Sequence, residues 1–357
     1  MLGYACKWVS ENPDKKQRLF EEQSYNGTTT TATWCDRQDT QTWQTKLLWC
    51  ARMNAEGMLR FVNHAATLPP HARMIRFGSG VLPLYTHERY RDFWQSDEVQ
   101  AYVASLLKPV GDRILETGAK VSFHPDHFTV LASENPIIRE RSREEVEYHA
   151  RMVELMGLTC SPVQCKINIH IGGKLGPAGF LEEYDKLSDL ARANVTVENA
   201  DIGAWEIESC LSMQRVPVVL DLHHHWIQTG EHLTPECDIW QRVLKTWPDG
   251  VKPTIHFSIS KEEYLPAADQ MPDLAQLLLA GAKKTELRAH SDAYHHPALV
   301  EYIGQWTEHA HIMLECKLKN IAHRDLLASL EFFCGGNARV WVSPDGSHVV
   351  KARDIIN

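Results

Sequence analysis

The feature that most constrains the fold is an alternation of two kinds of segment along nearly the whole chain. Short apolar runs rich in β-branched residues are each followed by a longer amphipathic segment, which is the pattern of consecutive βα units. The predicted strands cover residues 3–6, 73–77, 120–123, 166–169, 195–197, 217–220, 254–255 and 311–314. The predicted helices cover residues 39–66, 89–118, 142–157, 178–193, 202–213, 234–247, 271–281 and 318–333.

Eight βα units without a linker or a break in composition favour a single (β/α)8 TIM barrel over an open doubly wound sheet. No GxGxxG phosphate loop follows the first strand, so no nucleotide cofactor is expected. We expect a barrel domain over residues 1–334 and a short C-terminal appendix, resembling a hairpin, over residues 335–357. Residues 7–38 form a long polar excursion, where barrels place functional loops.

Composition excludes several classes of protein. No apolar run approaches the ~20 residues of a membrane span, and the N-terminal segment lacks the order of a secretory signal, so we expect a cytoplasmic chain without a membrane partner. Nine cysteines without a CxxC pair argue against a disulfide framework or a zinc ribbon. The net charge of -9 argues against binding nucleic acid through bulk charge. It leaves room for a local basic groove or for metal ions in an acidic cavity. We expect a monomer.

Histidine is abundant, with 19 residues, and its placement is informative. Six successive predicted strands end in a side chain that can bind metal, namely His124, His170, Glu198, Asp221, His256 and Glu315. The carboxyl ends of parallel barrel strands converge on one face, so these groups are expected to meet there. His87 and His290 in loops on the same face, with His224 in the segment DLHHH, complete a set of six histidines and three carboxylates.

This donor set predicts a metal cluster. Imidazoles mixed with carboxylates suit zinc or manganese, whereas a shell of oxygen alone would indicate magnesium or calcium. Nine ligands are too many for one ion, and two or three divalent ions would attract phosphate oxygens. A single histidine at a strand end is more often a core group, but six such positions in succession are not explained that way. Read as a strand, with alternating side chains, His223–His225 can supply only one ligand.

Nine segments in order resemble the ultraviolet damage endonuclease family, over residues 3 to about 330. They are GYAC (3–6), TTTTATW (28–34), FHPDHFTVLAS (123–133), NIHIGG (168–173), TVENAD (196–201), VLDLHHHWI (219–227), IHFS (255–258), AHSDAY (289–294) and IMLECKLK (312–319). The resemblance implies a (β/α)8 barrel that uses divalent metals, typically including manganese. It further implies cleavage of damaged double-stranded DNA on the 5′ side of a photolesion, leaving 3′-hydroxyl and 5′-phosphate ends.

The resemblance also implies a ligand set and catalytic residues. The family's metal ligands fall on His87, His124, His170, Glu198, Asp221, His224, His256, His290 and Glu315. Glu198, His256 and Glu315 are the expected catalytic residues, with two to three ions, Mn²⁺ first and Zn²⁺ or Mg²⁺ as alternatives. The family commonly has a lysine, which can be carboxylated, two residues before the ligand at 256. This chain has Thr254 there, so a carboxylated lysine is not expected.

Five residues are expected to contact DNA or the lesion, three of them by the same resemblance and two lysines by their position near the end of the last predicted strand. His127 and Phe128 stand where the family has a glutamine followed by an aromatic residue that probe the duplex, so the aromatic wedge is kept and the amide is not. Tyr4 matches a tyrosine near the flipped lesion, although it could equally be a core residue. Lys317 and Lys319 are candidates for phosphate contacts, with helix capping or pairing to nearby acids as the alternative.

Two other activities remain as alternatives on the same fold. One is an endonuclease IV-like enzyme that cleaves at abasic sites, which also uses a metal cluster. The other is a metal-dependent sugar isomerase, which needs one or two metals and a catalytic lysine or histidine pair. A pure binding module is disfavoured, because so many buried ionisable groups are costly unless a function compensates for them.

Overall fold

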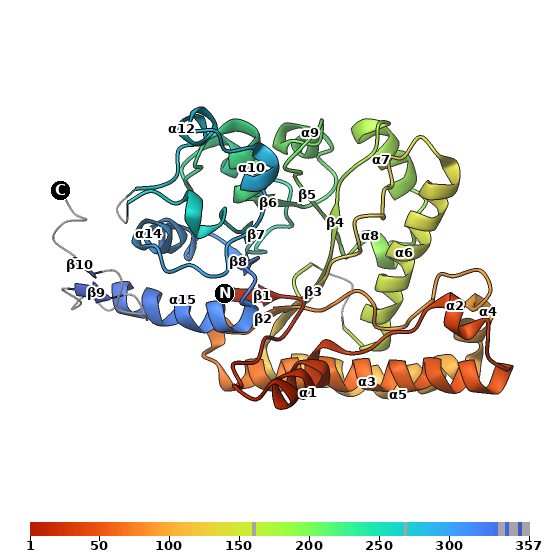
Figure 1. Cartoon of the computed structure of the whole chain (residues 1–357). Helices are drawn as coiled ribbons and strands as arrows, with labels where there is room; N and C mark the ends of the chain where they lie inside the picture. The colour runs from red at the N-terminus through yellow and green to blue at the C-terminus, as the bar shows by residue number, and fades with distance from the viewer. Residues whose placement is uncertain (159–161, 268–269, 335–339, 343–348, 352–357) are drawn as a thin grey trace. The chain divides into compact units, whose positions relative to one another are not determined.

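The computed structural model describes residues 1–158, 162–267, 270–334, 340–342 and 349–351. Eight strands follow one another in chain order around a closed barrel, which confirms the predicted (β/α)8 architecture (Figure 1). The strands are β1 (Leu2–Ala5), β2 (Met74–Arg76), β3 (Lys120–Phe123), β4 (Cys165–His170), β5 (Val195–Glu198), β6 (Val218–Asp221), β7 (Thr254–Phe257) and β8 (His311–Leu314).

Helices connect these strands. They are α1 (Lys15–Asn26), α2 (Ala32–Cys35), α3 (Thr40–Thr67), α4 (Arg91–Gln95), α5 (Asp97–Thr117), α6 (Pro136–Leu155), α7 (Gly176–Tyr184), α8 (Asp189–Arg192), α9 (Ile207–Ser212), α10 (Leu222–Thr229), α11 (Asp238–Leu244), α12 (Leu274–Leu279), α13 (Lys284–Leu287), α14 (Pro297–Trp306) and α15 (Lys319–Cys334), with 3-10 turns at Pro70–Ala72 and Glu262–Tyr264. In the described part of the chain, no helix is both long and apolar enough to cross a bilayer.

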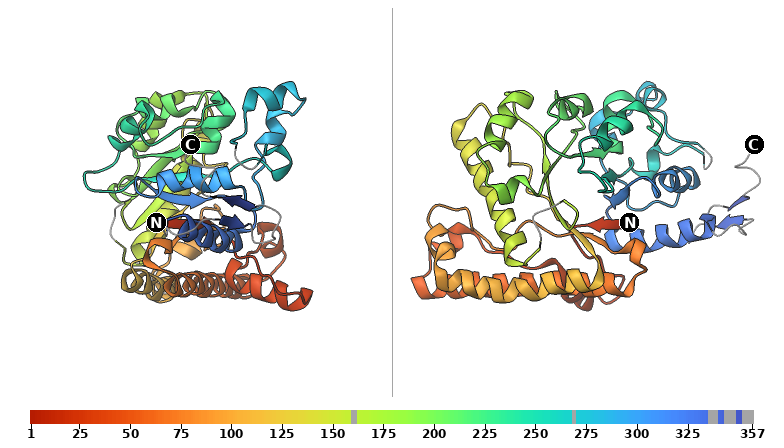
Figure 2. Two further views of the ribbon diagram at one scale, coloured as in Figure 1. Left: turned by 90° about the vertical axis from the view of Figure 1, so that its left-hand side faces the viewer. Right: turned by 180° about the vertical axis from the view of Figure 1, so that it is seen from behind.

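The chain divides into two compact units, which we call unit 1 (residues 1–5 and 198–357) and unit 2 (residues 6–197). In unit 1, β1 pairs in parallel with β8, and β7 pairs with β6 and β8. Helix α15 packs against β1 and α14 (Figure 2). The core of this unit includes three tryptophans that are almost completely buried, Trp226, Trp240 and Trp306.

Unit 2 is built on the parallel pairs β2–β3 and β3–β4. Helix α3 lies alongside α5, and α1 packs on α3 (Figures 1 and 2). Helix α5 comes so close to the end of α6 that a Cβ added at Gly111 would lie 1.7 Å from the carbonyl oxygen of Met156. Glycine is therefore required at that contact, since any side chain would separate the two helices.

Two expected helices differ in the structure because of their caps. Helix α6 begins at Pro136, not at 142, because the Asn135 side chain accepts the backbone N–H of Ile137 at 3.0 Å and proline suits the first helical position. The predicted helix 178–193 is divided into α7 and α8, and Ser188 caps the second piece. Helices α1, α2, α10, α13 and α14 lie outside the expected ranges. The excursion over residues 7–38 is partly helical because it contains α1 and α2.

The reading of His223–His225 as a strand is wrong. Asp221 ends β6, and its side chain accepts the backbone N–H of His224 at 2.7 Å, which starts helix α10 at Leu222. A short helix of eight residues has little periodicity by which a sequence pattern could reveal it.

The C-terminal appendix lies largely outside the described residues. Within it, β9 (Val340–Val342) and β10 (Val349–Lys351) form an antiparallel pair, as expected for a hairpin. The proposed domain boundary after residue 334 stays a prediction. The seven cysteines described with their side chains are free thiols, which agrees with the absence of a disulfide framework inferred from their spacing.

Asn54 on α3 is a buried residue that fixes two loops of unit 2. Its Oδ1 accepts the backbone N–H of Thr28 at 2.6 Å, and its Nδ2 faces the carbonyl oxygens of Thr28, Gly80 and Val81 at 2.8–3.1 Å. Replacement by alanine would leave these buried backbone groups without partners. We expect Asn54→Ala to lower the free energy of unfolding by about 2 kcal/mol, measured by urea denaturation.

The matched control is Asn63→Ala on the same helix. Asn63 is exposed and accepts one hydrogen bond, from Arg113 Nε at 2.9 Å. Its loss should change the free energy of unfolding by less than about 0.5 kcal/mol. Equal effects of the two substitutions would show that Asn54 does not have the anchoring role described here.

Candidate metal centre

Four side chains of unit 1 converge at the carboxyl ends of neighbouring strands. Glu198 ends β5, Asp221 ends β6, His256 lies on β7 and Glu315 follows β8. Each offers one ligand atom, and these four atoms lie within 4.8 Å of one another. All four residues are buried, with 0% of Glu198 and Asp221, 3% of His256 and 7% of Glu315 exposed. We refer to these four residues as the carboxylate cluster.

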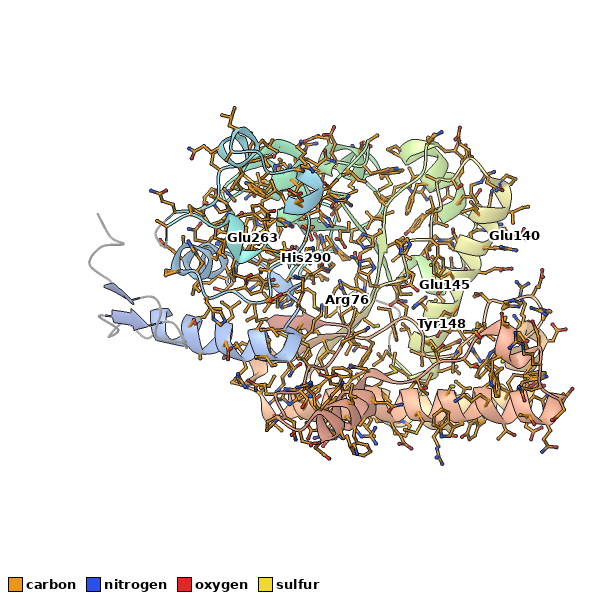
Figure 3. All side chains as sticks on the ribbon, viewed as in Figure 1. Arg76, Glu140, Glu145, Tyr148, Glu263 and His290 are labelled. Atoms are coloured by element: carbon orange, nitrogen blue, oxygen red, sulfur yellow. The ribbon has the colours of Figure 1, made fainter. Side chains whose placement is uncertain are left out.

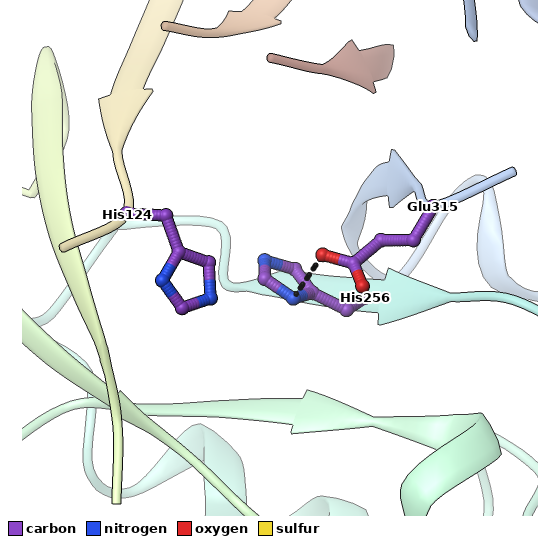
Figure 4. Close-up of side chains that lie close together, drawn as sticks. All are labelled: His124, His256 and Glu315. Atoms are coloured by element: carbon purple, nitrogen blue, oxygen red, sulfur yellow. Dashed lines mark ion pairs between the residues drawn. The ribbon is translucent and has the colours of Figure 1, made fainter. Parts of the chain in front are cut away.

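His256 lies between two acids of the cluster. Its Nδ1 is 3.0 Å from Glu198 Oε2 and 3.1 Å from Glu315 Oε1, and Figure 4 shows the second of these ion pairs as a dashed line. Burial acts to lower the pKa of His256, but the two carboxylates outweigh it and raise that pKa to about 10. A positive charge is therefore strongly favoured between these acids.

Asp221 uses its two oxygens differently. Oδ1 caps α10, whereas Oδ2 is buried, has no hydrogen-bond partner among the described residues, and lies 3.8 Å from His224 Nδ1. Burial raises the pKa of Asp221, and the nearby acids Glu198 and Glu315 add to this effect against the opposing influence of His224. A buried carboxylate oxygen without a donor calls for a cation. Three carboxylates and an imidazole thus fit a divalent ion such as Mn²⁺ or Zn²⁺.

The three histidines of α10 point to different surroundings. His224 Nδ1 lies 3.3 Å from Glu198 Oε1, so this residue contacts the carboxylate cluster. The ring of His223 stacks on Trp226, with 5.7 Å between ring centroids. His225 Nε2 lies 3.7 Å from an oxygen of Glu231. One of the three therefore contacts the cluster, as expected, although helix geometry rather than strand alternation selects it.

His290 and Thr254 also lie in unit 1. His290 Nδ1 is 2.5 Å from the main-chain oxygen of Glu315, and the backbone of His290 forms a β-bridge with Ser260. Among the described residues, no group of three ligand atoms within 4.8 Å contains His87, His224 or His290. Thr254 lies two residues before His256 on β7, is buried, and its hydroxyl has no hydrogen-bond partner in the described part of the chain.

Three expected ligands belong to unit 2. His124 directly follows β3 and His170 ends β4, and their rings lie 4.2 Å apart between centroids. His87 lies in the loop after β2, where its Nδ1 accepts the backbone N–H of Arg89 at 3.3 Å. The structure thus brings two of these three histidines together.

His87 lines a groove of about 1030 Å³ in unit 2. Phe128, which is 58% exposed, lines the same groove, and so do Glu145 and Tyr148 of α6, which are labelled in Figure 3. Burial raises the pKa of Glu145 to about 7. Sequence reasoning missed this groove because it placed the start of α6 too late. The pair Asn135–Pro136, a cap followed by a proline, was the signal available.

The other residues expected to contact DNA have varied surroundings. Tyr4 is 1% exposed, and its ring lies 5.3 Å from that of His323. His127 is exposed beside Phe128. Lys317 Nζ lies 3.2 Å from Asp292 Oδ1, and Lys319 is the first residue of α15. Their roles toward DNA stay predictions.

Comparison with known proteins identifies the family. The family model described as UV-endonuclease UvdE matches residues 1–339 of the chain. The chain belongs to the UvdE family. The resemblance seen in the nine sequence segments is thereby confirmed, and this membership supports the prediction of a DNA repair endonuclease.

Relatives of this UvdE chain include the UV DNA damage endonuclease of Bacillus pumilus (strain SAFR-032), which is 33% identical over 198 residues. That match covers 53% of this chain and 59% of the relative, less than two thirds of its length. The UV DNA damage endonuclease of Halalkalibacterium halodurans is 28% identical over 295 residues, which cover 80% of this chain and 82% of that relative.

Solved structures show the same fold. The crystal structure of SacUVDE has a TM-score of 0.70 with 21% identity, over 93% of this UvdE chain and 98% of that chain. Endonuclease IV from Thermus thermophilus has a TM-score of 0.52 with 12% identity, over 78% of this chain and 95% of that one. At these identities the likeness concerns the fold alone.

Removal of one charge from the carboxylate cluster tests its affinity for metal. We expect Glu198→Gln and Glu315→Gln each to weaken Mn²⁺ binding by more than about tenfold, because each removes an anionic ligand while keeping the shape of the side chain. Thermal melts in chelator should show little loss of stability, since the barrel core does not include the metals.

The control is Glu301→Gln, which removes an exposed carboxylate of α14 in the same unit. Titration calorimetry should find wild-type Mn²⁺ affinity for this variant. Wild-type affinity in both cluster variants would contradict the assignment of a metal centre to these residues.

Proposed function

We propose that this UvdE family chain is a DNA repair endonuclease that hydrolyses the phosphodiester bond on the 5′ side of a UV photolesion in double-stranded DNA, leaving 3′-hydroxyl and 5′-phosphate ends. The observation that carries the proposal is the buried carboxylate cluster at the carboxyl ends of barrel strands, where barrel enzymes place their catalytic groups. The match to the UV-endonuclease family over residues 1–339 supports DNA as the substrate.

The cluster is proposed to belong to a site that holds two or three divalent ions, with Mn²⁺ as the expected metal. Glu198, Asp221, His256 and Glu315 supply the central donors, and His87, His124, His170, His224 and His290 complete the proposed set. Such ions, when bound, lower the pKa of water and stabilise the departing oxygen of a phosphodiester.

The protein groups themselves orient and desolvate the site. Glu198 and Glu315 hold the ring of His256 from two sides through Nδ1. The burial of all four cluster residues excludes competing water, which strengthens the electrostatic attraction of the carboxylates for a bound cation. Glu198, His256 and Glu315 are the proposed catalytic residues on this basis.

Recognition of the lesion is proposed to involve the groove of unit 2. Five carboxylates and two guanidinium groups line it, so it suits the N–H groups of base edges better than phosphates. A photodimer is poorly stacked, and extruding it from the duplex costs less than extruding normal bases. Phe128, exposed beside this groove, is proposed to fill the vacated stack, with His127 beside it.

Incision of defined duplexes tests the activity. Oligonucleotides that contain one cyclobutane dimer, one abasic site or no lesion should be compared with Mn²⁺ and with chelator. We expect a single cut 5′ of the dimer that requires metal and leaves a 3′ end that a polymerase can extend. Efficient cutting at the abasic site alone would favour the endonuclease IV-like alternative. The absence of any cut would contradict the proposal and leave the isomerase to be tested with sugars.

Phe128→Ala tests the wedge. We expect binding to a dimer-containing duplex to weaken by about 1–3 kcal/mol, the range found for stacking of a base on an aromatic side chain, with no change in melting temperature. Incision of a substrate whose lesion is already unpaired should be spared. Fluorescence anisotropy and gel assays measure the two effects.

Phe20→Ala is the matched control, because Phe20 is a phenylalanine of α1 that is 67% exposed. Its removal should leave binding and incision unchanged. If Phe128→Ala behaves like this control on paired lesion DNA, another loop probes the duplex.

A further inference from the structure

Asn199 directly follows Glu198, and its side chain binds the backbone of Asp221 by two hydrogen bonds. Oδ1 accepts the N–H of Asp221 at 2.8 Å, and Nδ2 donates to the Asp221 carbonyl oxygen at 3.1 Å. The backbone N–H can only donate and the carbonyl can only accept, so this pair fixes the orientation of the amide. The side chain thus acts as an additional peptide group beyond the end of β5. Asn199 is 1% exposed, so water cannot replace these bonds.

The main chain of the same residue fixes a histidine. The carbonyl oxygen of Asn199 lies 2.8 Å from His224 Nδ1. Because a carbonyl can only accept, Nδ1 carries a hydrogen, and in the neutral ring the lone pair is on Nε2. Histidines that bind metal are commonly held in this way by a carbonyl at the opposite ring nitrogen.

We propose that Asn199 is a positioning residue of the metal centre, which holds Asp221 and His224 in place against Glu198 before an ion arrives. This inference rests on the proposed metal-dependent function. Its physical basis is preorganisation. Hydrogen bonds join Asn199 to Asp221 and His224, and the peptide bond joins it to Glu198, so binding an ion orders little that is not already ordered.

Loss of the amide should loosen this arrangement. In Asn199→Ala the N–H and carbonyl groups of Asp221 lose their partners, although the residue that follows β5 still supplies its own carbonyl to His224. Asn199→Ser restores a short polar group and is the milder test. Neither substitution touches a proposed ligand atom.

The experiment measures metal affinity directly. Mn²⁺ binding to the full chain is followed by titration calorimetry and by the electron paramagnetic resonance signal of free Mn²⁺. We expect Asn199→Ala to raise the dissociation constant by about 10–100-fold, the range found for residues that orient metal ligands, and Asn199→Ser to raise it less. Raising Mn²⁺ above the new constant should restore incision, with the KM for DNA unchanged.

Asn194→Ala is the matched control. Asn194 is a buried asparagine immediately before β5, and its Nδ2 donates to the Leu190 carbonyl at 2.8 Å. The same truncation there should lower the melting temperature without changing the Mn²⁺ dissociation constant of the folded protein. Asn199→Ser serves as the deciding variant if Asn199→Ala does not fold.

The outcomes separate this inference from the proposed function. If the wild-type chain binds Mn²⁺ and the Asn199 variants bind it equally well, the positioning role is overturned and the proposed function is left intact. A wild-type chain that binds no Mn²⁺ overturns both. A loss of affinity in the Asn199 variants, absent in Asn194→Ala and reversed by excess metal, supports the inference.

Discussion

Three acids of unit 1 are buried close together, and this concentration of negative charge governs the rest of the site. Glu198, Asp221 and Glu315 cannot all remain ionised in such a place without positive charge nearby. His256 and His224 meet part of that need through their Nδ1 atoms. The parallel barrel brings these groups together because its strands end on one face, so the fold itself creates the need for a cation.

Much of the fold can be predicted from the sequence, because a long hydrophobic pattern remains recognisable even where single residues depart from it. Runs of β-branched residues predict the strands, and helical patterns predict the long helices α3 and α15, which have 28 and 16 residues. Helix starts and short helices are harder to predict, because single hydrogen bonds at Asn135 and Asp221 decide where the long helix α6 and the short helix α10 begin. Such bonds depend on the conformation of the neighbouring turn, which cannot be predicted from the hydrophobic periodicity of the sequence.

The site was predictable to a similar degree. Strand-end residues such as Glu198, Asp221 and His256 could be placed on one face from topology alone, and the structure brings them together. The directions of loop and helix side chains could not be predicted from topology. His87 and His290, both in loops, lie outside the groups of three ligand atoms that the described residues form.

Asp221 illustrates how one position can be restricted by two demands at once. Its Oδ1 accepts the N–H that begins helix α10, and its Oδ2 is a ligand atom of the cluster that accepts no hydrogen bond from the described residues. Serine, threonine or asparagine could cap the helix but would bring no anion, and glutamate would bring the anion on a stem one methylene too long to cap. Aspartate alone among the twenty amino acids meets both requirements. Position 221 is therefore restricted more tightly than a position that has only to supply an anionic ligand.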